Sequence, residues 1–471
     1  MNPLFPPSDY RQQVDQMLGV ALARAEQRVL AGSVVPTFDF GEFRTQLARY
    51  DFQRRQPLSD VLHWTIEQLE HGLVHANHPR YFGLFNPTPT FPAQCADRIA
   101  ASFNPQLATA TTSPSAVEIE SHVIRSVAQR AGLPSETRGH FTTGGSEANY
   151  TALVLALTRV KPDFSSRGAR AFSGQPVFYA SWDSHLAWLK IAHQAGIGRD
   201  AVRLVATDGS GRLHVPRLET MIIADRTAGY VPFLIAATAG TTNAGMIDPL
   251  QDCVRVAHAY GLWCHMDAAW AGALIASDDL RGRLAGLEQA DSVTIDAHKW
   301  FATTMGCGMF LTRTPGLLSS TFEASNTYMP SNIANVDPYV TSVQWSRRFV
   351  GLRLFLALAA AGWTGYAAHV EHALRLSHVL RRRLLEAGWT IANDSPAGVV
   401  CAIPPDPASA RAIVTRVVAS GCAWVSIATF ESREVIRACV TSGLTTDEDV
   451  DTLVTALVQN SNFTGEMRWT M

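Results

Sequence analysis

The segment PFLIAATAGTTNAGMIDPLQDCVRVAHAYGLWCHMDAAWAG, residues 232–272, holds two apolar runs on either side of a helix-like stretch. The runs PFLIAAT and LWCHMD have the composition of buried strands, and LQDCVRVAHAYG between them has the apolar spacing of a helix. Two strands joined in this way lie parallel in one sheet, because the helix carries the chain back across the face of the sheet. This unit therefore predicts an α/β fold.

The same alternation continues through the middle third of the chain. Further strand-like runs are VFYAS at 177–181, VRLVAT at 202–207, DSVTID at 291–296 and GMFLT at 308–312, and a helical run occupies 147–160. Apolar strands that alternate with helices predict a mostly parallel central sheet covered on both faces. Ligands of such sheets bind beyond the carboxyl ends of the strands, so the residues that end these runs are the first candidates for a site.

Three regions are predicted along the chain. Residues 1–80 contain charged and apolar groups at helical spacing and form a helical N-terminal segment. Residues 81–346 form a large domain around the sheet. Residues 347–471 begin with long helical runs and continue with VVCAIP, AWVSIAT and VIRACVT, which predicts a smaller C-terminal α/β domain.

The composition argues against several classes of protein. The 471 residues are 47% apolar and 17% charged with a formal net charge of -2, which is typical of a globular protein and not of a nucleic-acid or anionic-membrane binder. The N-terminal MNPLFPPSDYRQQ is too polar for a signal peptide, and the apolar runs are too short to span a bilayer. The seven cysteines include no CxxC pair, which favours reduced thiols and predicts a cytoplasmic location.

A glycine turn follows the strand-like run GHFTT. The sequence TTGGSEAN, residues 142–149, passes through Gly144 and Gly145 into a helix, with Ser146 near its start. Glycines let a ligand approach the backbone and free N–H groups at a helix start favour an anion, so one interpretation is a phosphate cradle. The alternatives are an ordinary turn with Ser146 as the helix cap, or the nucleophile elbow of a serine hydrolase, since GGSEA nearly matches GxSxG.

Three other strand ends carry polar residues. Asp267 ends a buried run and needs a partner there, which is either a backbone N–H, an arginine or the protonated ring nitrogen of a cofactor. His185 in WDSHLAW and Thr242 in AGTTNAG also follow strands, although each alone indicates little.

A metal site is not expected. His71, His75 and His78 in HGLVHANH have metal-ligand spacing on one face of a helix. Pro79 follows directly, however, and disfavours helix in the residue before it.

The sequence DAHKW, residues 296–300, contains one of only three lysines in the chain, which are Lys161, Lys190 and Lys299. A lysine at a buried strand end is seldom structural, because its charge must be paired or neutralised. Lysine also forms Schiff bases with aldehydes when desolvation lowers its pKa. A glycine cradle, a buried acid, a histidine and an isolated lysine at neighbouring strand ends together predict pyridoxal phosphate.

As an ordered set, these motifs resemble those of the group II pyridoxal-phosphate amino-acid decarboxylases, which include aromatic-amino-acid, glutamate and diaminobutyrate decarboxylases. The likeness runs from HPRYFGLFNP through TTGGSEAN, WDSHLAW, ATAGTTNAG, HMDAAWAG and DAHKW to RRFVGLR. The resemblance implies an aspartate-aminotransferase-like fold, pyridoxal-phosphate fold type I. It also implies a homodimer with the active site at the interface and residues 1–80 as a dimerisation segment.

The resemblance further implies roles for single residues. Lys299 is implied to bind the cofactor through a Schiff base, Asp267 to keep its ring nitrogen protonated and His185 to stack on the ring. Tyr328 in EASNTYMPSN is implied to donate the proton that replaces carbon dioxide. The other implied cofactor contacts are Gly144, Gly145, Ser146, Thr242, Ala269 and His298. Asp296 is unexpected beside a phosphate, where a neutral residue is usual.

The implied substrate-side residues are Phe85, Thr88, Ala108 and Arg437. Arg437, in VIRACVTSG, stands where glutamate decarboxylases have a carboxylate-binding arginine. In FNPQLATATTSP the small Ala108 and Ala110 stand where aromatic decarboxylases have bulky rings, and Leu84 also replaces an aromatic residue. A wider or differently shaped pocket is therefore expected, including one for a bulky secondary-metabolite amino acid.

The predicted reaction is the α-decarboxylation of an L-amino acid, aromatic or other. The alternative is an enzyme of the same fold with a diverted outcome: oxidative deamination to an aldehyde, or β-elimination from a cysteine conjugate. Tyr328 and His185 are both present, which favours simple decarboxylation. Two more distant alternatives are a serine hydrolase based on Ser146, for which no histidine follows His378, and a cofactor-free scaffold of the same fold.

Overall fold

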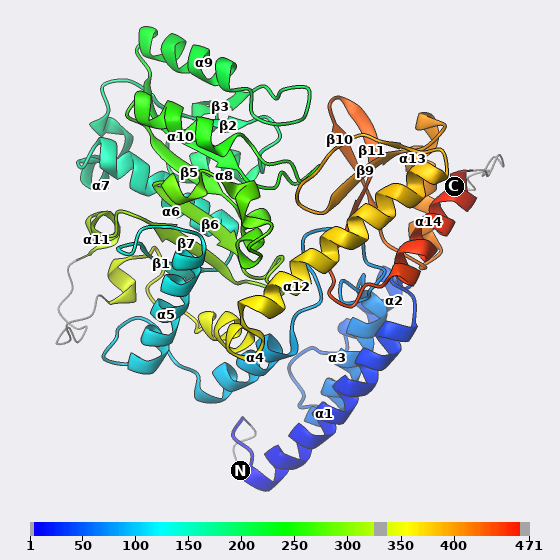
Figure 1. The fold of residues 1–471 in the computed structure, drawn as a ribbon. Coiled ribbons are helices and arrows are strands. Elements are labelled where there is room, and N and C mark those ends of the chain that lie inside the picture. The colour runs from blue at the N-terminus through cyan, green and yellow to red at the C-terminus, as the bar shows by residue number, and fades with distance from the viewer. Residues whose placement is uncertain (1–3, 325–336, 462–471) are drawn as a thin grey trace.

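The computed structural model describes residues 4–324 and 337–461, and a seven-stranded sheet forms the centre of its larger part (Figure 1). The strands in chain order are β1 (Arg138–Thr142), β2 (Pro176–Ser181), β3 (Val202–Val205), β4 (Val231–Thr238), β5 (Trp263–Asp267), β6 (Ser292–Asp296) and β7 (Gly308–Thr312). Their order across the sheet is β1-β7-β6-β5-β4-β2-β3.

Five neighbouring strands of this sheet, from β3 through β2, β4 and β5 to β6, are parallel. Of the seven strands, only β7 runs in the opposite direction, so that it pairs antiparallel with both β6 and β1. The two apolar runs of residues 232–272 become β4 and β5, in register from Leu234 opposite Trp263 to Thr238 opposite Asp267. The predicted mostly parallel sheet is therefore confirmed.

Helices cover both faces of the sheet, because the strands bury apolar side chains on both sides. Helices α5 (Pro114–Arg130), α9 (Val215–Thr227), α10 (Leu250–Ala259) and the start of α12 (Gly351–Glu386) share one apolar core with the sheet. Helices α6 (Gly145–Val160), α8 (Ala187–Gln194) and α11 (Gly316–Phe322) share the core on the other face, and α7 (Phe164–Arg167) follows α6. None of the helices in the described ranges is both long and apolar enough to cross a bilayer.

The C-terminal part has its own sheet, which α12 connects to the larger part (Figure 1). Helix α12 is kinked at Gly362, whose φ of 64° is outside the helical range. The sheet has the order β10-β11-β9-β8 and is antiparallel throughout. Its strands are β8 (Thr390–Ile391), β9 (Val399–Ile403), β10 (Ser426–Phe430) and β11 (Arg433–Cys439), flanked by α13 (Ala410–Ala419) and α14 (Asp447–Ser461). The boundaries at residues 80 and 346 stay predictions.

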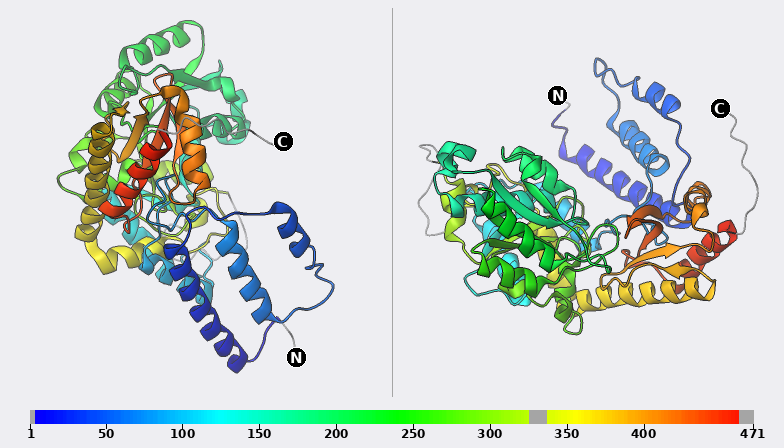
Figure 2. Two further views of the ribbon diagram at one scale, coloured as in Figure 1. Left: turned by 90° about the vertical axis from the view of Figure 1, so that its right-hand side faces the viewer. Right: turned by 90° about the horizontal axis from the view of Figure 1, so that it is seen from above.

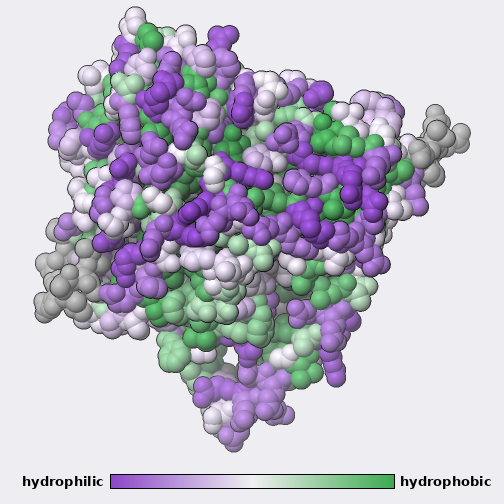
Figure 3. All heavy atoms as spheres, viewed as in Figure 1, coloured by the Kyte–Doolittle hydropathy of each residue, from purple (hydrophilic) through white to green (hydrophobic). Residues whose placement is uncertain are grey.

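The N-terminal helices α1 (Ser8–Ala31), α2 (Phe40–Leu47) and α3 (Leu58–Gly72) project from the molecule, as Figure 2 shows, while α4 (Phe91–Phe103) packs near α12. None of α1, α2 and α3, all of whose residues are described, contains a buried side chain. Exposed apolar residues on them include Val20, Leu22, Phe40, Leu47 and Leu69. In Figure 3 hydrophobic surface gathers in the lower half of the view, at the base of these helices.

Candidate active site

A cavity of about 320 Å³ lies at the carboxyl ends of β4, β5 and β6, beside the start of α6. Polar residues that end or follow strands line it, as expected for a parallel sheet. Ten of the predicted site residues are in this lining: Phe85, Gly144, Gly145, Ser146, His185, Thr242, Asp267, Ala269, His298 and Lys299. The fold thus brings together residues that are far apart in the sequence.

Lys299 lies in the turn after β6, where its backbone N–H donates to the Asp296 carbonyl at 3.2 Å. Its Nζ is 3.1 Å from Oδ2 of Asp296 and 5.8 Å from the centre of the Phe85 ring. The side chain is 21% exposed, so the amine is paired in charge yet accessible from the cavity. A partly buried amine that faces a cavity is suited to react with an aldehyde there.

Asp267, the last residue of β5, is 5% exposed. Its Oδ1 accepts from the Ala269 N–H at 3.2 Å, and its Oδ2 accepts from Nδ2 of Asn149 at 2.8 Å. Within residues 4–324 and 337–461 it forms no ion pair, so both partners are neutral donors. No cation in the described residues pairs with this buried carboxylate, so it is placed to pair with a cation in the cavity.

Helix α6 starts at the glycine turn, and no side chain of the described residues caps its N-terminus. Its first N–H groups are therefore available to an anion from the cavity. A methyl group on Gly145 would lie 2.9 Å from Oδ2 of Asp296 and 3.4 Å from Cβ of Ala269. Only glycine allows this close approach of the turn to the strand ends.

Two histidines of the cavity accompany these groups. Nδ1 of His185 accepts from the Ala187 N–H at 3.2 Å. Burial lowers the pKa of His185, although the charge of Asp267 acts in the opposite direction. His185 is therefore neutral at neutral pH and offers a ring face rather than a charge. His298 has its Nε2 4.0 Å from Oδ2 of Asp296.

Two predicted substrate residues are outside the lining of this cavity. Thr88 donates through Oγ1 to the Asn77 carbonyl at 2.9 Å. Ala108 is 1% exposed, and its carbonyl accepts from the Tyr339 N–H at 3.2 Å. Tyr328, the predicted proton donor, lies outside the described residues.

Arg437, the third predicted substrate residue absent from the lining, contacts residues that do line the cavity. Its guanidinium carbon is 4.8 Å from the centre of the Phe85 ring, and its Nε donates to the Thr242 carbonyl at 2.9 Å. Nη1 donates to the Gly83 carbonyl, whereas Nη2 is buried and has no hydrogen-bond partner in the described chain. Arg437 thus keeps one buried guanidinium nitrogen without a partner next to Phe85, a residue that lines the cavity.

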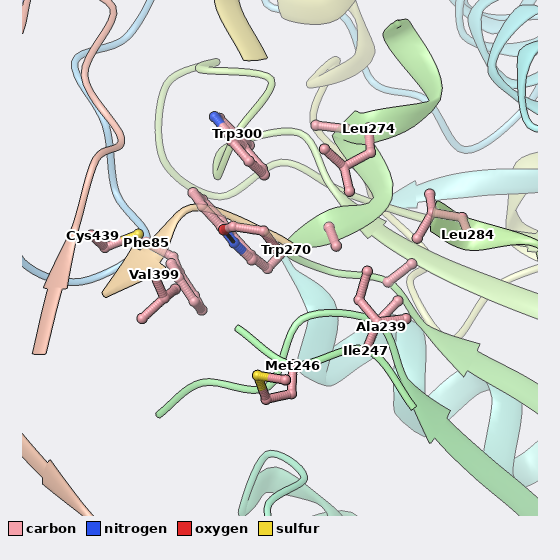
Figure 4. Close-up of a cluster of buried hydrophobic side chains, with 14 of the residues drawn as sticks. Phe85, Ala239, Met246, Ile247, Trp270, Leu274, Leu284, Trp300, Val399 and Cys439 are labelled. Atoms are coloured by element: carbon pink, nitrogen blue, oxygen red, sulfur yellow. Dashed lines mark hydrogen bonds between the residues drawn. The ribbon is translucent and has the colours of Figure 1, made fainter. Parts of the chain in front are cut away.

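Aromatic rings continue the wall of the cavity beyond Phe85. The rings of Phe85 and Trp270 are stacked with centroids 4.0 Å apart, and Trp270 and Trp300 are stacked at 4.5 Å (Figure 4). Trp270 also donates through Nε1 to the Ala397 carbonyl at 2.8 Å. The stack fixes the Phe85 ring between Arg437 and the large domain.

Asn149, Trp270 and Asp296 also line the cavity but were not among the predicted site residues. Asn149 follows Gly145 by four positions, so it lies on the same face of α6. That spacing within TTGGSEAN was the available signal for it. Trp270 follows the predicted Ala269 directly and Asp296 precedes the predicted His298 by two positions, but only the directions of their side chains show that they line the cavity.

The residues of the cavity fit pyridoxal phosphate. The uncapped start of α6 suits its phosphate, Asp267 suits its ring nitrogen and Lys299 suits its aldehyde. Because Gly145 has no side chain, the backbone of the turn can lie close to a phosphate. Asp267 accepts from neutral donors, so no cation of the described residues competes with the ring nitrogen for it.

Comparison with known proteins supports this fit. The model of the pyridoxal-dependent decarboxylase conserved domain matches residues 44–402. The L-2,4-diaminobutyrate decarboxylase of Rhizobium meliloti (strain 1021) is 33% identical over 313 residues, which cover 66% of this chain and 61% of that protein. The acidic amino acid decarboxylase of Mus musculus is 33% identical over 328 residues, or 68% of this chain and 58% of that one. The chain thus spans about three fifths of the length of these two relatives.

A third relative aligns over more of its length. The aromatic-L-amino-acid decarboxylase of Bacillus atrophaeus is 26% identical over 432 residues, 88% of each chain. Among solved structures, apo mouse CSAD superposes with a TM-score of 0.90 at 26% identity, over 97% of this chain and 99% of that one. Oryza sativa TDC with PLP and tryptamine, at 23% identity and a TM-score of 0.90 over 98% and 99%, shares the fold. The predicted fold class is therefore confirmed.

Proposed function

Since the chain belongs to the pyridoxal-dependent decarboxylase family, we propose that it catalyses the α-decarboxylation of an L-amino acid with pyridoxal phosphate. The domain match over residues 44–402 confirms the family and the cofactor that the sequence predicted. The observation that carries the proposal is the position of Lys299 in one cavity with Asp267 and the uncapped start of α6. The alternative of a serine hydrolase based on Ser146 finds no support in these relatives.

The residues of the cavity divide the work of holding the cofactor. Lys299 supplies the amine that binds the aldehyde, and Asp267 holds the proton on the ring nitrogen. The start of α6 with Gly144, Gly145 and Ser146, together with His298, binds the phosphate. His185, Ala269 and Thr242 line the space around the ring. When bound, pyridoxal phosphate supplies an acceptor for the electron pair that remains when the carboxylate leaves.

Proton transfer is assigned to Tyr328 and His185, and control of the charge on the ring to Asp267. Asp267 keeps the ring nitrogen cationic, because a buried carboxylate with neutral partners favours a cation beside it. Tyr328 donates the proton to Cα of the product, and the neutral His185 can relay it. With both residues present, release of the amine is proposed over oxidative deamination or β-elimination.

Arg437 is proposed to bind a carboxylate of the substrate. Its free Nη2 is buried beside Phe85, and a buried unpaired donor is costly unless a ligand satisfies it. Phe85, Thr88 and Ala108 are proposed to contact the substrate side chain. Because Phe85 is fixed by the stack on Trp270, it sets a rigid boundary on that side.

A homodimer with the active site at its interface is part of the proposal. Helices α1, α2 and α3 have no buried residue in this chain and expose apolar side chains, so a second copy is the natural cover. A cytoplasmic location is also proposed, supported by seven cysteines that are all unpaired.

The test uses the scarcity of lysine. Lys299→Ala should abolish the visible absorbance of bound pyridoxal phosphate and lower decarboxylation by at least about 1000-fold. Borohydride reduction of the wild type should attach a pyridoxyl group to the peptide that carries Lys299. Lys190→Ala, in an exposed lysine, is the matched control and should retain colour and activity.

Amino acids are then screened for carbon dioxide release, and products are analysed in air. If the product is an amine and no aldehyde, ammonia or peroxide is formed, the result supports simple decarboxylation. A purified protein that takes up no pyridoxal phosphate, or a Lys299→Ala variant that stays coloured and active, would refute the proposal.

A further inference from the structure

A chain of buried polar side chains extends from Asp267 into the layer between the sheet and α6. Nδ2 of Asn149 is 2.8 Å from Oδ2 of Asp267, and Oδ1 of Asn149 is 3.0 Å from Nε2 of His265. Nδ1 of His265 is 2.8 Å from Oγ of Ser292, to which Nε1 of Trp263 donates at 2.8 Å. All five residues are at most 5% exposed.

The hydrogen atoms of this chain have one consistent arrangement. An ionised Asp267 only accepts, so Asn149 must present its Nδ2 to it and its Oδ1 to His265. His265 must then donate from Nε2, and as a neutral imidazole it accepts at Nδ1 from the Ser292 hydroxyl. The indole of Trp263 can only donate, and its bond to the same oxygen completes the series. In this series of hydrogen bonds, every donor group thus points toward Asp267.

Burial keeps His265 in the neutral state that this arrangement requires. It lowers the pKa of His265 to about 4, although the charge of Asp267 acts the other way. Thr294 Oγ1, 3.3 Å from the same Nε2, is an acceptor for the ring N–H and adds no charge. With His265 neutral, Asp267 is the only residue in this series of hydrogen bonds that carries a charge.

The surroundings of these residues argue against a purely structural role. The layer between the sheet and α6 is otherwise a core of apolar side chains such as Leu153, Ala156 and Phe233. Polar groups in such a layer are costly unless all are satisfied, and a well-packed apolar core would be at least as stable. A complete chain that ends on a carboxylate of the cavity therefore indicates a function at that carboxylate.

We infer that Asn149 is a positioning residue that holds Asp267 ionised and oriented toward the cofactor ring nitrogen. The series Trp263, Ser292 and His265 fixes the orientation of the Asn149 amide. This inference rests on the proposed role of Asp267 but on no step of the reaction. Neither Asn149 nor His265 needs to touch the substrate or the cofactor for it to hold.

The experiment measures binding, not activity. The apoprotein is titrated by equilibrium dialysis with pyridoxal phosphate and with its carbocyclic analogue, in which C–H replaces the ring nitrogen. Wild type should prefer pyridoxal phosphate, because the analogue cannot place a cation beside Asp267. In Asn149→Leu this preference should fall about 10-fold, the loss expected for one charge-assisted hydrogen bond.

A matched control separates positioning from folding. Asn393 is also a buried, fully hydrogen-bonded asparagine, bound to the Ala244 carbonyl at 2.7 Å and to the Cys401 N–H at 2.9 Å, outside the cavity. Asn393→Leu should lower the midpoint of thermal unfolding as Asn149→Leu does. It should leave the ratio of the two dissociation constants at the wild-type value.

A second variant keeps the inference testable if Asn149→Leu does not fold. Ser292→Ala removes one oxygen that is not in the lining of the cavity and frees His265 to take the other tautomer, which would reverse the orientation of the Asn149 amide. The preference should then fall about 5-fold, as for one neutral hydrogen bond. A wild-type preference that survives unchanged in the folded variants overturns the inference alone. Equal binding of both ligands by wild type overturns the role of Asp267 as well, and no binding of either overturns the proposed function.

Discussion

The side-chain nitrogen of Lys299 lies 3.1 Å from Oδ2 of Asp296, a residue that is only 2% exposed. The other carboxylate oxygen of Asp296 has no hydrogen-bond partner in the described chain. The same Oδ2 lies beside Gly145, at the start of α6 where we propose that the cofactor phosphate binds. Asp296 thus pairs with the amine and also places a negative charge next to the expected anion site.

Asp296→Asn should therefore tighten cofactor binding. Neighbouring like charges repel by a few kcal/mol at an effective dielectric constant of about 20, and the lost pairing with Lys299 offsets part of this. We expect the dissociation constant for pyridoxal phosphate to fall roughly 10-fold by equilibrium dialysis. Asp394→Asn, in a fully exposed carboxylate, should leave it unchanged. Weaker binding by Asp296→Asn would show that the pairing with Lys299 dominates.

Arg437→Met should raise KM for the amino-acid substrate. The variant removes the free Nη2, and a charge-assisted hydrogen bond contributes about 1.5–3 kcal/mol, so KM should rise about 10-fold or more. Cofactor affinity should change little. The control is Arg381→Met, a partly buried arginine that donates to the Asn393 carbonyl at 2.9 Å. If KM rises equally in both variants, the effect is one of general destabilisation.

His140 should make the protein sensitive to acid. Burial lowers its pKa to about 3, and neither ring nitrogen has a hydrogen-bond partner among the described residues. In the unfolded chain the histidine binds a proton near pH 6.5, whereas in the folded protein it does so only near pH 3. The free energy of unfolding is therefore unaffected by His140 above about pH 6.5 and falls by about 1.4 kcal/mol for each pH unit between about pH 6.5 and pH 3. His140→Leu removes this loss and should exceed wild type in free energy of unfolding by about 2 kcal/mol at pH 5.

The measurement for His140→Leu is urea unfolding at pH 7.5, 6 and 5. The exposed His193, replaced by leucine, is the control, because its ring remains in contact with water in both states. Equal pH slopes for His140→Leu and wild type would contradict the assignment.

Removing one member of the buried ion pair of Arg347 and Glu120 should be strongly destabilising. Both side chains are 5% exposed, and Glu120 also accepts from the Gly351 N–H at 3.0 Å. Arg347→Met leaves the buried carboxylate unpaired and should lower the free energy of unfolding by about 3–5 kcal/mol. Adding Glu120→Gln should restore part of the loss, which urea unfolding can measure.

The exposed pair of Arg375 and Asp447 is the comparison for that experiment. Its side chains are 50% and 58% exposed, so Arg375→Met should cost less than about 1 kcal/mol. A similar cost for the two arginine variants would mean that the pair of Arg347 is not desolvated in solution.

The sequence predicted those parts of the site that depend on local pattern. Apolar runs mark β4 and β5, the paired glycines mark the start of α6, and the rarity of lysine marks Lys299. A parallel topology brings the carboxyl ends of the strands together, so the order of these motifs along the chain is enough to group their residues in one site.

What escaped prediction depends on packing between elements. His265 and Ser292 are adjacent only because β5 and β6 pair in register, and Asn149 reaches them only because α6 lies over both strands. In the sequence, His265 is one polar residue inside an apolar run. The direction of the Asp296 side chain and the free Nη2 of Arg437 are likewise properties of the assembled structure.

The stacked tryptophans beside the cavity give the protein an internal optical reporter. Trp270 lines the cavity, and its ring is parallel to that of Trp300 within 1°. A chromophore that binds in the cavity should therefore change the fluorescence of both tryptophans. They are two of 11 tryptophans, so loading of a light-absorbing cofactor should quench a measurable share of the intrinsic emission. Occupancy could then be followed by fluorescence in real time, without substrate, label or coupled assay.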